Sequence, residues 1–320
     1  MSRQYLREIP SGSSVSMVCL VRSKALRAAR NGTLYIEMEL ADKSGSLPTR
    51  MWNATQEVFD SLEIDGFVEV SGRIETYRNQ LQMVVNSINL AREADIDLAD
   101  FLPCTEHDTG KMLKELRKIA SSVKRPYLKS LLDAFFADDK FCEQLATAPA
   151  AVTYHHAVIG GLLEHTLSVA ELAVQVAERY PKIDRDLLIA GSIFHDIGKI
   201  DELSYHRSFQ YTDSGQLIGH IVLGLLQVEE RAKRIDGFPG NLLDQLRHLM
   251  LSHHGEYDFG SPKLPMSVEA VALHHIDNLD AKINAFNQII ENDRDPSTAW
   301  TEWSRMFERR LYKGPSRESE

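Results

Sequence analysis

The chain has 320 residues, of which 43% are hydrophobic and 26% are charged. This composition is typical of folded globular proteins, and the length suits two domains better than one. The formal net charge of -10 argues against a protein that coats nucleic acid over its whole surface. Residues 1–90 carry ten basic and ten acidic side chains, so the excess of acid lies in the rest of the chain. A local basic groove is therefore not excluded.

The cysteines and the apolar runs indicate the compartment. The three cysteines, Cys19, Cys104 and Cys142, are far apart and form no CxxC pair, which predicts free thiols in a reducing environment. Any metal must then be held by histidine and aspartate. No apolar run has the length of a membrane span, and the first ten residues do not resemble a signal peptide. We expect a cytoplasmic protein without membrane contact.

Residues 1–92 alternate short β-like segments with turn residues. Five segments have the composition and bounds of strands: Ser14–Arg22, Leu34–Leu40, Leu47–Trp52, Phe67–Ile74 and Leu81–Ile88. A helical piece, Asn53–Leu62, lies between the third and the fourth. Five strands with a helix after the third is the order of an OB-fold barrel. We therefore predict an all-β OB-fold domain over residues 1–92.

The loops of this predicted barrel suggest a ligand. An OB-fold binds through strands 2 and 3 and through the loops between strands 1 and 2 and strands 4 and 5. Basic loops beside aromatic groups fit a single nucleic-acid strand held by phosphate contacts and base stacking. The candidate residues are Lys24, Arg27 and Arg30 in the expected first loop, Trp52 on the third strand, and Tyr77 and Arg78 in the other loop. The alternative is that Trp52 fills the barrel and the basic side chains are only solvated.

Residues 93–108 are acidic, include Pro103 and lack periodicity, which predicts a linker. From residue 109 to residue 320 we predict an all-α domain. Its first helices are expected at Gly110–Val123, Pro126–Ala137 and Asp138–Ala148. Near the end, Trp300, Trp303 and Phe307 have the spacing of an amphipathic helix, which would pack on this domain or form a subunit contact. The oligomeric state is therefore left open, and a homo-oligomer is one alternative.

The second domain is organised around His195 and Asp196. They follow an apolar helical run, Asp186–Phe194, and precede Gly198. Neighbouring side chains on a helix point about 100° apart, so both can reach one ion only where the helix ends. Imidazole and carboxylate together suit Mn, Fe, Co or Zn, and an aspartate can bridge two ions.

Other potential ligands surround this pair in order along the chain. His165 lies near the start of one expected helix, His220 heads another, and His253 and His254 end a third; Asp277 lies inside a fourth, from Met266 to about Asn292. This order resembles the HD-domain metal-dependent phosphohydrolase superfamily, over residues 110–312. The resemblance implies one ion on His165, His195, Asp196 and Asp277, and a second on Asp196, His220 and His253. For His254 metal binding, phosphate contact and helix capping all remain open.

Two further residues follow from the chemistry of such a site. Two divalent ions support phosphodiester hydrolysis by activating water and neutralising phosphate charge. Asp196 would be central to catalysis, and Lys199, one turn after His195, is placed to offset phosphate charge. Lys199 could instead be a helix-end cation that interacts with the helix dipole. His156, Tyr205 and Arg207 are candidates for substrate contact, and a small hairpin is expected around Phe209 and Tyr211.

A narrower resemblance covers the whole chain. Residues 42–45 (DKSG) and 50–52 (RMW) resemble the anticodon-binding type of OB domain. Together with residues 201–205 (DELSY), 219–220 (GH), 278–282 (NLDAK) and 309–314 (RRLYKG), they resemble the YhaM family of 3'-5' exoribonucleases. The resemblance implies hydrolysis of single-stranded RNA to 5'-mononucleotides, with single-stranded DNA as a second substrate. It also implies Mn or Co as the activating metal, while the histidine and carboxylate donors leave Fe open as well, with Zn or Mg as alternatives.

Two other functions remain open at this point. One is a phosphohydrolase of small nucleotides or cyclic dinucleotides, although such a substrate needs no strand-binding domain. The other is a nucleic-acid-binding regulatory protein with a vestigial HD site, although every position of the ligand set is occupied by a residue that can bind metal.

Overall fold

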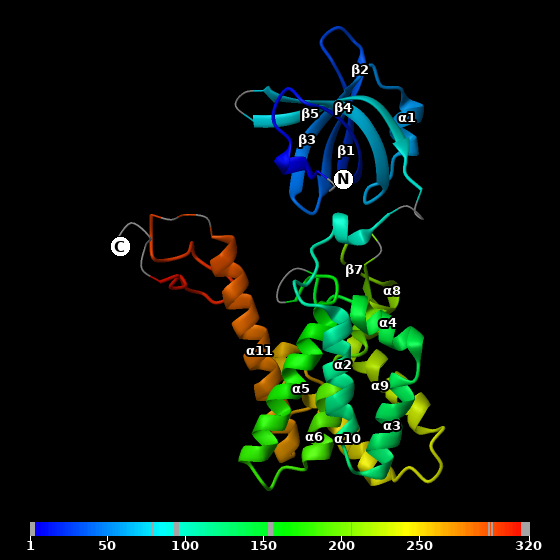
Figure 1. Cartoon of the computed structure of the whole chain (residues 1–320), viewed down its shortest axis with the longest axis vertical. Helices are drawn as coiled ribbons and strands as arrows, with labels where there is room; N and C mark the ends of the chain where they lie inside the picture. The colour runs from blue at the N-terminus through cyan, green and yellow to red at the C-terminus, as the bar shows by residue number, and fades with distance from the viewer. Residues whose placement is uncertain are drawn as a thin grey trace. The chain divides into compact units, whose positions relative to one another are not determined.

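The computed structural model describes residues 4–77, 80–92, 96–152, 156–205, 207–293, 295 and 297–314. The chain divides into two compact units (Figure 1). The first is Met1–Pro103 with the short segment His206–Ser208, and the second is Cys104–Tyr205 with Phe209–Glu320. Within the described ranges, no helix has both the length and the apolar character that crossing a bilayer requires.

The first unit is a closed barrel of five strands in the order β1-β2-β3-β5-β4. The strands are β1 (Ser14–Ala28), β2 (Leu34–Asp42), β3 (Gly45–Trp52), β4 (Phe67–Tyr77) and β5 (Gln80–Leu90), with α1 (Gln56–Ser61) between β3 and β4 and a short 3₁₀ turn, η1 (Leu6–Glu8), before β1. All neighbours pair antiparallel except β3 and β5, which are parallel. Alternate residues such as Ile36, Met38 and Leu40 fill the interior. The predicted OB-fold is confirmed.

The first strand is longer than predicted, and this moves the expected basic loop. β1 continues to Ala28 after a bulge between Val21 and Ser23, and pairs Lys24 with Met38 of β2. Pairing satisfies backbone groups that a loop would leave to water, and the bulge lets the strand curve round the barrel. The connection between β1 and β2 is therefore only residues 29–33, which include Arg30.

Part of the predicted linker also belongs to the first unit. A 3₁₀ turn, η3 (Leu98–Asp100), is followed by Phe101, which is 1% exposed. The Phe101 ring packs against Leu20 and Phe67, with 4.9 Å between the two phenyl centroids. The few apolar residues in this acidic stretch thus form a small second cluster with side chains of β1 and β4.

The second unit is helical, as predicted. Its long elements are α2 (Thr109–Ser121), α3 (Pro126–Phe136), α4 (Asp139–Thr147), α5 (Gly161–Arg179), α6 (Arg185–Phe194), α9 (His220–Ala232), α10 (Gly240–Ser252) and α11 (Val268–Asn292). Shorter pieces are α7 (Lys199–Glu202), α8 (Asp213–Ile218), η4 (Tyr257–Phe259) and the paired strands β6 (Leu203–Ser204) and β7 (Gln210–Tyr211), which form the expected hairpin. Asp108, Asp138, Asp184 and Ser267 cap the starts of α2, α4, α6 and α11 through side-chain hydrogen bonds.

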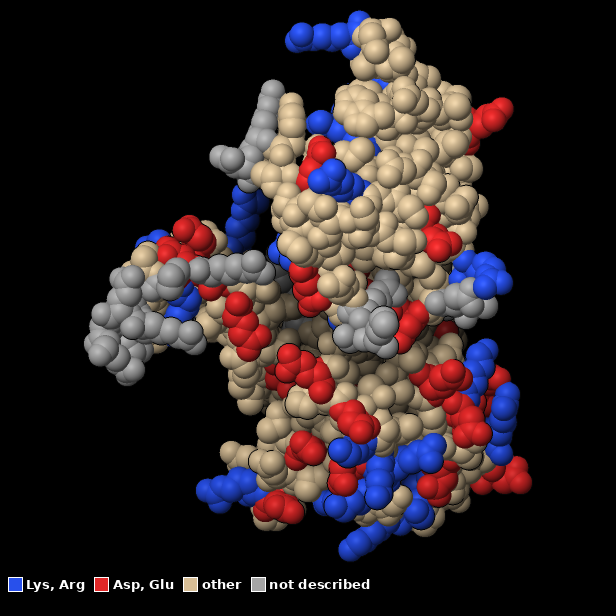
Figure 2. Space-filling model, turned by 45° about the horizontal axis from the view of Figure 1, so that its top comes forward, with Lys and Arg blue, Asp and Glu red and all other residues tan. Residues whose placement is uncertain are grey.

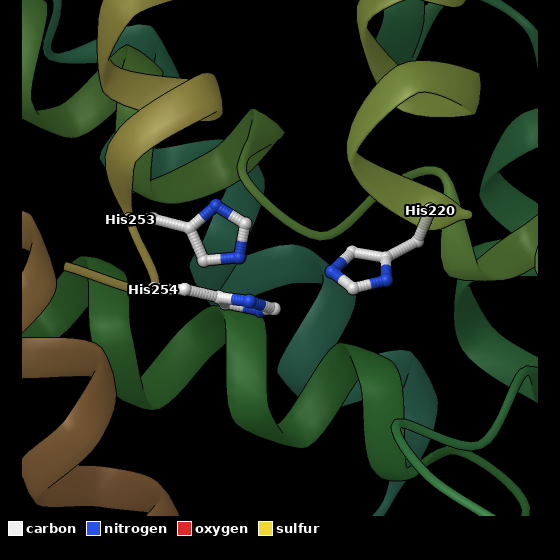
Figure 3. Close-up of side chains that lie close together, drawn as sticks. All are labelled: His220, His253 and His254. Carbon is white, nitrogen blue, oxygen red and sulfur yellow. The ribbon is translucent and has the colours of Figure 1, made fainter. Parts of the chain in front are cut away.

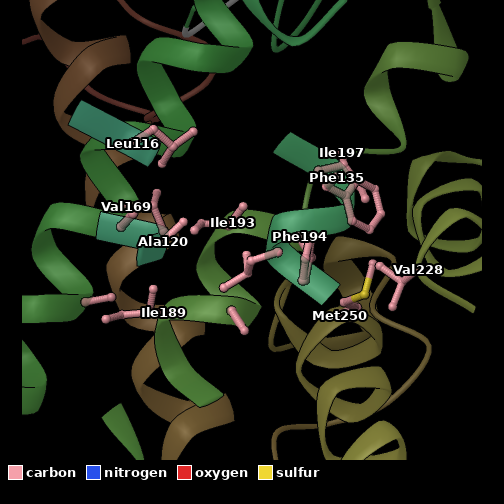
Figure 4. Packing of buried hydrophobic residues seen from close by; sticks show 14 of the residues in the cluster. Leu116, Ala120, Phe135, Val169, Ile189, Ile193, Phe194, Ile197, Val228 and Met250 are labelled. Atoms are coloured by element: carbon pink, nitrogen blue, oxygen red, sulfur yellow. The ribbon is translucent and has the colours of Figure 1, made fainter. Parts of the chain in front are cut away.

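Helix α6 runs through the middle of this unit. Every residue from Leu187 to Phe194 is buried. Figure 4 shows Ile189, Ile193 and Phe194 surrounded by side chains from several helices, among them Leu116, Phe135, Val169, Val228 and Met250. A helix that is apolar on all sides lies inside the protein, so the residues that follow its last turn are also inside. His195 and Asp196 are delivered to the interior in this way.

The C-terminal segment differs from its prediction. Residues 297–314 contain no helix; Trp300 bridges to Tyr312 and Ser304 to Arg309 in an antiparallel arrangement. The ring of Phe307 packs at a tilt against that of Phe286 of α11, with 4.2 Å between ring centroids. The helical spacing of three aromatic residues covers only eight positions. Backbone hydrogen bonds between the two antiparallel stretches, such as the one from the N–H of Thr301 to the carbonyl of Leu311, form instead. The predicted amphipathic helix is wrong.

The charge of the second unit is mixed. In the view of Figure 2, acidic and basic side chains are interspersed over the helical unit. On the face shown, the acidic side chains of this unit therefore do not form a single patch.

Candidate metal centre

His195 and Asp196 occupy the point where the chain leaves α6. His195 is the C-cap residue of α6, and both side chains are at most 3% exposed. The Nδ1 atom of His195 lies 2.8 Å from the carbonyl oxygen of Ser192. A carbonyl can only accept a hydrogen bond, so Nδ1 carries the proton and Nε2 presents a lone pair. The helix end thus turns an imidazole and a carboxylate toward the same interior space.

We call the first group of potential ligands the first half of the centre: His165, His195, Asp277 and the Oδ2 atom of Asp196. The Nε2 atom of His165 lies 3.1 Å from Nε2 of His195 and 3.2 Å from Oδ1 of Asp277. Oδ2 of Asp196 lies 3.5 Å from each of these imidazole nitrogens. Donor atoms about 2.1 Å from one ion are separated by roughly 3.0–3.4 Å, so this spacing suits a single divalent cation.

The second half of the centre is formed by the other oxygen of Asp196 with His220, His253 and His254. Oδ1 of Asp196 lies 3.4 Å from Nε2 of His220 and 3.5 Å from Nε2 of His253. These three atoms are buried and have no hydrogen-bond partner among the described residues. Figure 3 shows the imidazoles of α9 and of the end of α10 facing one another. Unpaired buried polar atoms are costly, and a shared cation would satisfy all three.

The remaining histidines are held in the same tautomer as His195. Each places Nδ1 against an acceptor and so leaves Nε2 free to bind metal. The acceptors are the carbonyls of Met250 for His253 (2.8 Å) and Phe259 for His254 (2.9 Å), and the carboxylates of Asp280 for His165 (2.7 Å) and Glu202 for His220 (3.0 Å). The donor set is thus prearranged for cations.

The charges point the same way. Burial opposes ionisation of Asp196, but Lys199 and His195 outweigh it and hold the pKa of this carboxyl well below its usual range. Burial also opposes ionisation of Asp277, but the neighbouring imidazoles of His165 and His195 outweigh it and hold the pKa of this carboxyl well below its usual range. Burial, with repulsion from His253 and His220, lowers the pKa of His254 to about 4, so this imidazole is neutral near pH 7. Carboxylates are therefore charged here and at least one imidazole is free to act as a ligand.

His165 lies among three carboxylates. Burial disfavours its charged form, but Asp196, Asp277 and Asp280 together raise its pKa well above the usual value. The same carboxylates that favour a proton at this imidazole favour a metal cation beside it. The carboxylates of Asp196, Asp277, Asp280 and Glu202 all lie against imidazoles of the centre, whereas Lys199 contacts Asp196 alone among them. Buried carboxylates grouped in this way call for cations.

Two glycines permit the close packing that brings the ligands together. A Cβ atom on Gly198 would lie 1.9 Å from the carbonyl oxygen of His220, so glycine lets the start of α9 approach the end of α6. A Cβ atom on Gly161 would lie 2.0 Å from the carbonyl oxygen of His156. Here glycine lets the preceding loop pack on the first turn of α5, which carries His165.

The other predicted residues of the helical unit have different positions. Nζ of Lys199 lies 2.6 Å from Oδ2 of Asp196, so it belongs to the centre. His156 is buried but faces Asp280 (3.2 Å) and Glu164 (3.6 Å), on the far side of His165 from the ligands. Tyr205 is half-buried against the helical core and does not line the cavity described next.

A cavity of about 580 Å³ opens onto the centre. Ligand candidates from both halves form one wall, together with Lys199. The other walls come from Phe259, from α11 through Asn278 and Lys282, and from the C-terminal segment through Phe307 and Arg309. A polymer end or a nucleotide placed here would meet the ligands and cationic groups together.

Aromatic side chains are exposed on the barrel. Trp52 is 45% exposed and packs on Tyr35 of the neighbouring strand, with ring centroids 4.9 Å apart. The alternative in which Trp52 fills the barrel is wrong. Tyr77 is also 45% exposed, and the guanidinium of Arg50 lies 5.4 Å from the centre of its ring. Two exposed rings with a nearby guanidinium are suited to stacking against bases.

Several of the predicted basic contacts are already engaged. Nζ of Lys24 donates to the carbonyl of Phe59 (2.7 Å) and to that of Leu62, and so holds the end of α1. Arg27 forms an ion pair with Glu37 at 2.9 Å. Arg207, in the short segment that groups with the barrel, pairs with Glu63 at 2.7 Å. Arg30 is exposed in the turn after β1, and Arg78 lies outside the described residues.

Asp280 and Glu202 are absent from the site predicted from sequence. Asp280 lies one helical turn after Asp277, and this spacing is a signal that both face the same side of α11. Glu202 gives no comparable signal, because its contact with His220 depends on how α7 and α9 pack.

The comparisons agree with both units. Residues 162–282 match the HD domain family, and residues 15–91 match a family of OB-fold nucleic acid binding domains. The 3'-5' exoribonuclease YhaM of Geobacillus sp. (strain WCH70) is 35% identical over 281 residues, covering 88% of this chain and 86% of that protein. The YhaM protein of Bacillus subtilis (strain 168) is 34% identical, covering 88% of each chain.

Solved structures give a weaker likeness. The second OB-fold domain of replication protein A from Methanococcus maripaludis matches 28% of this chain and 94% of its own, with 20% identity and a TM-score of 0.23. That similarity is too low to bear on function. Identity to the YhaM proteins extends over both units, so the chain belongs to the family of the 3'-5' exoribonuclease YhaM.

Proposed function

We propose that the protein is a metal-dependent 3'-5' exonuclease that hydrolyses single-stranded RNA to 5'-mononucleotides. The observation that carries this proposal is the position of Asp196, which turns one carboxylate oxygen to each of two groups of buried ligand atoms. Relatives that match 88% of the chain are named 3'-5' exoribonucleases, which supports the substrate and the polarity.

Two divalent ions fit this donor set. The first would be held by His165, His195, Asp196 and Asp277, and the second by Asp196, His220, His253 and His254. Nitrogen and oxygen donors without sulfur suit Mn²⁺, Co²⁺ or Fe²⁺, with Zn²⁺ or Mg²⁺ as alternatives. Two ions at such a centre supply an activated water and neutralise charge on the phosphate during hydrolysis.

The surrounding side chains prepare the cavity for a phosphodiester. Burial disfavours the charged form of Lys199, but the contact with Asp196 raises its pKa, so its ammonium stays protonated at the cavity wall. Lys282 and Arg309 line the same cavity from α11 and the C-terminal segment. These cations attract the phosphates of an entering strand, and Arg309 offers the planar donors that suit phosphate oxygens.

The barrel captures the strand. Trp52, Tyr35 and Tyr77 offer rings for base stacking, while Arg50 and Arg30 offer charges to the phosphates. Stacking does not distinguish RNA from DNA, since every base has a flat face. We therefore expect single-stranded DNA to bind as well, with RNA as the preferred substrate because the relatives are named exoribonucleases.

One experiment tests the function directly. The full chain is incubated with Mn²⁺ and a single-stranded RNA that is labelled at its 5' end, and the products are separated by length over time. We expect labelled fragments that shorten progressively from the 3' end while 5'-mononucleotides accumulate. Intact RNA with each of the metals above, together with hydrolysis of small nucleotides, would instead support the small-nucleotide phosphohydrolase.

A further inference from the structure

One histidine in each half of the centre is held by a carboxylate. His165 of the first half places Nδ1 2.7 Å from Oδ2 of Asp280, and His220 of the second half places Nδ1 3.0 Å from Oε1 of Glu202. The other three imidazoles are held by backbone carbonyls, which carry no charge. Each half therefore has one ligand whose orientation depends on an ionised side chain.

Asp280 is fixed by a network of its own. It lies one turn after Asp277 on α11, so the same helix provides a ligand and the acceptor for another ligand. Besides His165 it contacts Nε2 of His156 at 3.2 Å and accepts a hydrogen bond from Ser168. These three contacts set the position of the carboxylate from three sides.

Glu202 holds both the ring and the backbone of His220. Its Oε1 atom accepts from Nδ1 at 3.0 Å and from the backbone N–H of the same residue at 2.9 Å. Its side chain is 10% exposed. One carboxylate at the end of α7 thus fixes the first residue of α9.

We propose that Asp280 and Glu202 are positioning residues that set the metal affinity of the two halves separately. A charged acceptor on Nδ1 fixes the tautomer and the ring orientation of a histidine ligand and makes Nε2 more basic. Among the contacts that the structure describes, Asp280 makes no hydrogen bond to the second half and Glu202 makes none to the first. The inference rests on the two-metal centre of the proposed function and adds the residues that tune each half.

Metal binding by the full chain tests this. The metal-free protein is titrated with Mn²⁺, and the concentration of free Mn²⁺ is measured from its electron paramagnetic resonance signal. We expect two bound ions per wild-type chain. Asp280→Asn weakens the affinity for one ion by about 10–100-fold and Glu202→Gln weakens that for the other, since this is the usual effect of removing such a partner. The double variant weakens both.

Matched controls separate positioning from a general loss of charge. Glu171→Gln removes a carboxylate that lines the same 690 Å³ cavity as Asp280, and Asp201→Asn removes the neighbour of Glu202, which contacts Gln227. Both controls should bind two ions like the wild type. Asp280→Ala should lose more affinity than Asp280→Asn, because the amide oxygen still accepts a hydrogen bond from His165.

Thermal melting of each metal-free variant shows whether it folds. If Asp280→Asn does not fold, His156→Gln removes only one donor to Asp280 and should weaken the same ion by a smaller factor. Wild-type affinity for both ions in Asp280→Asn and Glu202→Gln would overturn the inference. Equal loss of both ions in each variant, or a double variant that still binds one ion tightly, would also overturn it.

Different results would contradict the proposed function and this inference. A wild-type chain that binds two ions but leaves RNA intact contradicts the exonuclease proposal while the variants still test the positioning residues. A wild-type chain that binds no divalent ion contradicts both.

Discussion

The exposed face of the barrel and the buried centre of the helical unit use side chains in opposite ways. On the barrel, Trp52 and Tyr77 are nearly half exposed, and the guanidinium of Arg50 lies near a ring. In the helical centre, His165, His195 and Asp196 are at most 3% exposed. Every imidazole in the centre has a fixed partner for its Nδ1 atom.

This difference follows from what each surface has to bind. A single strand of varying sequence contacts an exposed surface through many weak, similar interactions, so no one residue is decisive. A metal ion requires several donors within a few tenths of an ångström, and burial makes each unpaired donor costly. Substitutions should therefore have graded effects on the barrel and nearly complete effects in the centre.

The strongest test of this contrast is Asp196→Asn. The variant keeps the shape of the side chain but loses the charge that both halves share. We expect RNA hydrolysis to fall by more than the roughly 10²–10³-fold that follows from removing one preorganised donor. RNA affinity, measured by fluorescence anisotropy, should not change. A variant with most of its activity would show that the ligands are wrongly assigned.

The next largest effect is expected for Gly198→Ala. The added methyl group would lie 1.9 Å from the carbonyl oxygen of His220 and 2.5 Å from the backbone nitrogen of Gly224, so α9 must move away. We expect a loss of stability of about 1–3 kcal/mol and release of one ion, measured by urea unfolding and Mn²⁺ titration. Gly240→Ala is the control, because its Cβ has no atom within 4 Å. Equal behaviour of the two variants would contradict the role of close packing.

On the barrel, Trp52→Ala should weaken binding without affecting chemistry. Loss of one stacking ring costs about 1–3 kcal/mol of RNA binding free energy, while the rate at saturating RNA stays the same. Fluorescence anisotropy and initial rates measure the two quantities. Tyr180→Ala removes a ring of the helical unit that is 59% exposed and should change neither. A lower rate at saturating RNA for Trp52→Ala would contradict the claim that the barrel contributes to binding and not to hydrolysis.

The smallest effect is expected for the two basic residues Arg30 and Lys24, to which we assign different roles. Arg30→Gln should weaken RNA binding modestly and reduce the slope of log affinity against log salt by about 1, because one phosphate contact is lost. Lys24→Met should leave that slope unchanged and instead lower the melting temperature, since Lys24 holds two carbonyls at the end of α1. A smaller salt slope and an unchanged melting temperature for Lys24→Met would show that Lys24 contacts the nucleic acid.

The sequence pointed to the histidines and aspartates that the structure gathers in the centre, but not to the residues that surround them. His195 and Asp196 were recognisable because an apolar run stops beside them. The partners of His165 and His220 were not, since Asp280 has only its spacing from Asp277 as a signal and Glu202 depends on the packing of two helices. The basic residues of β1 were assigned to a loop because the bulge that extends the strand has no clear sequence pattern.

By itself, the sequence determined the two fold classes and their order, and it indicated the histidines and aspartates that we propose as metal ligands. Hydrophobic periodicity and turn residues are local, so they can be read along the chain. The tertiary structure alone decided which oxygen of Asp196 faces which histidines, which carboxylates hold them, and that Lys24 supports the fold. These contacts join residues that are far apart in the chain, and their distances depend on helix packing that glycines such as Gly198 permit.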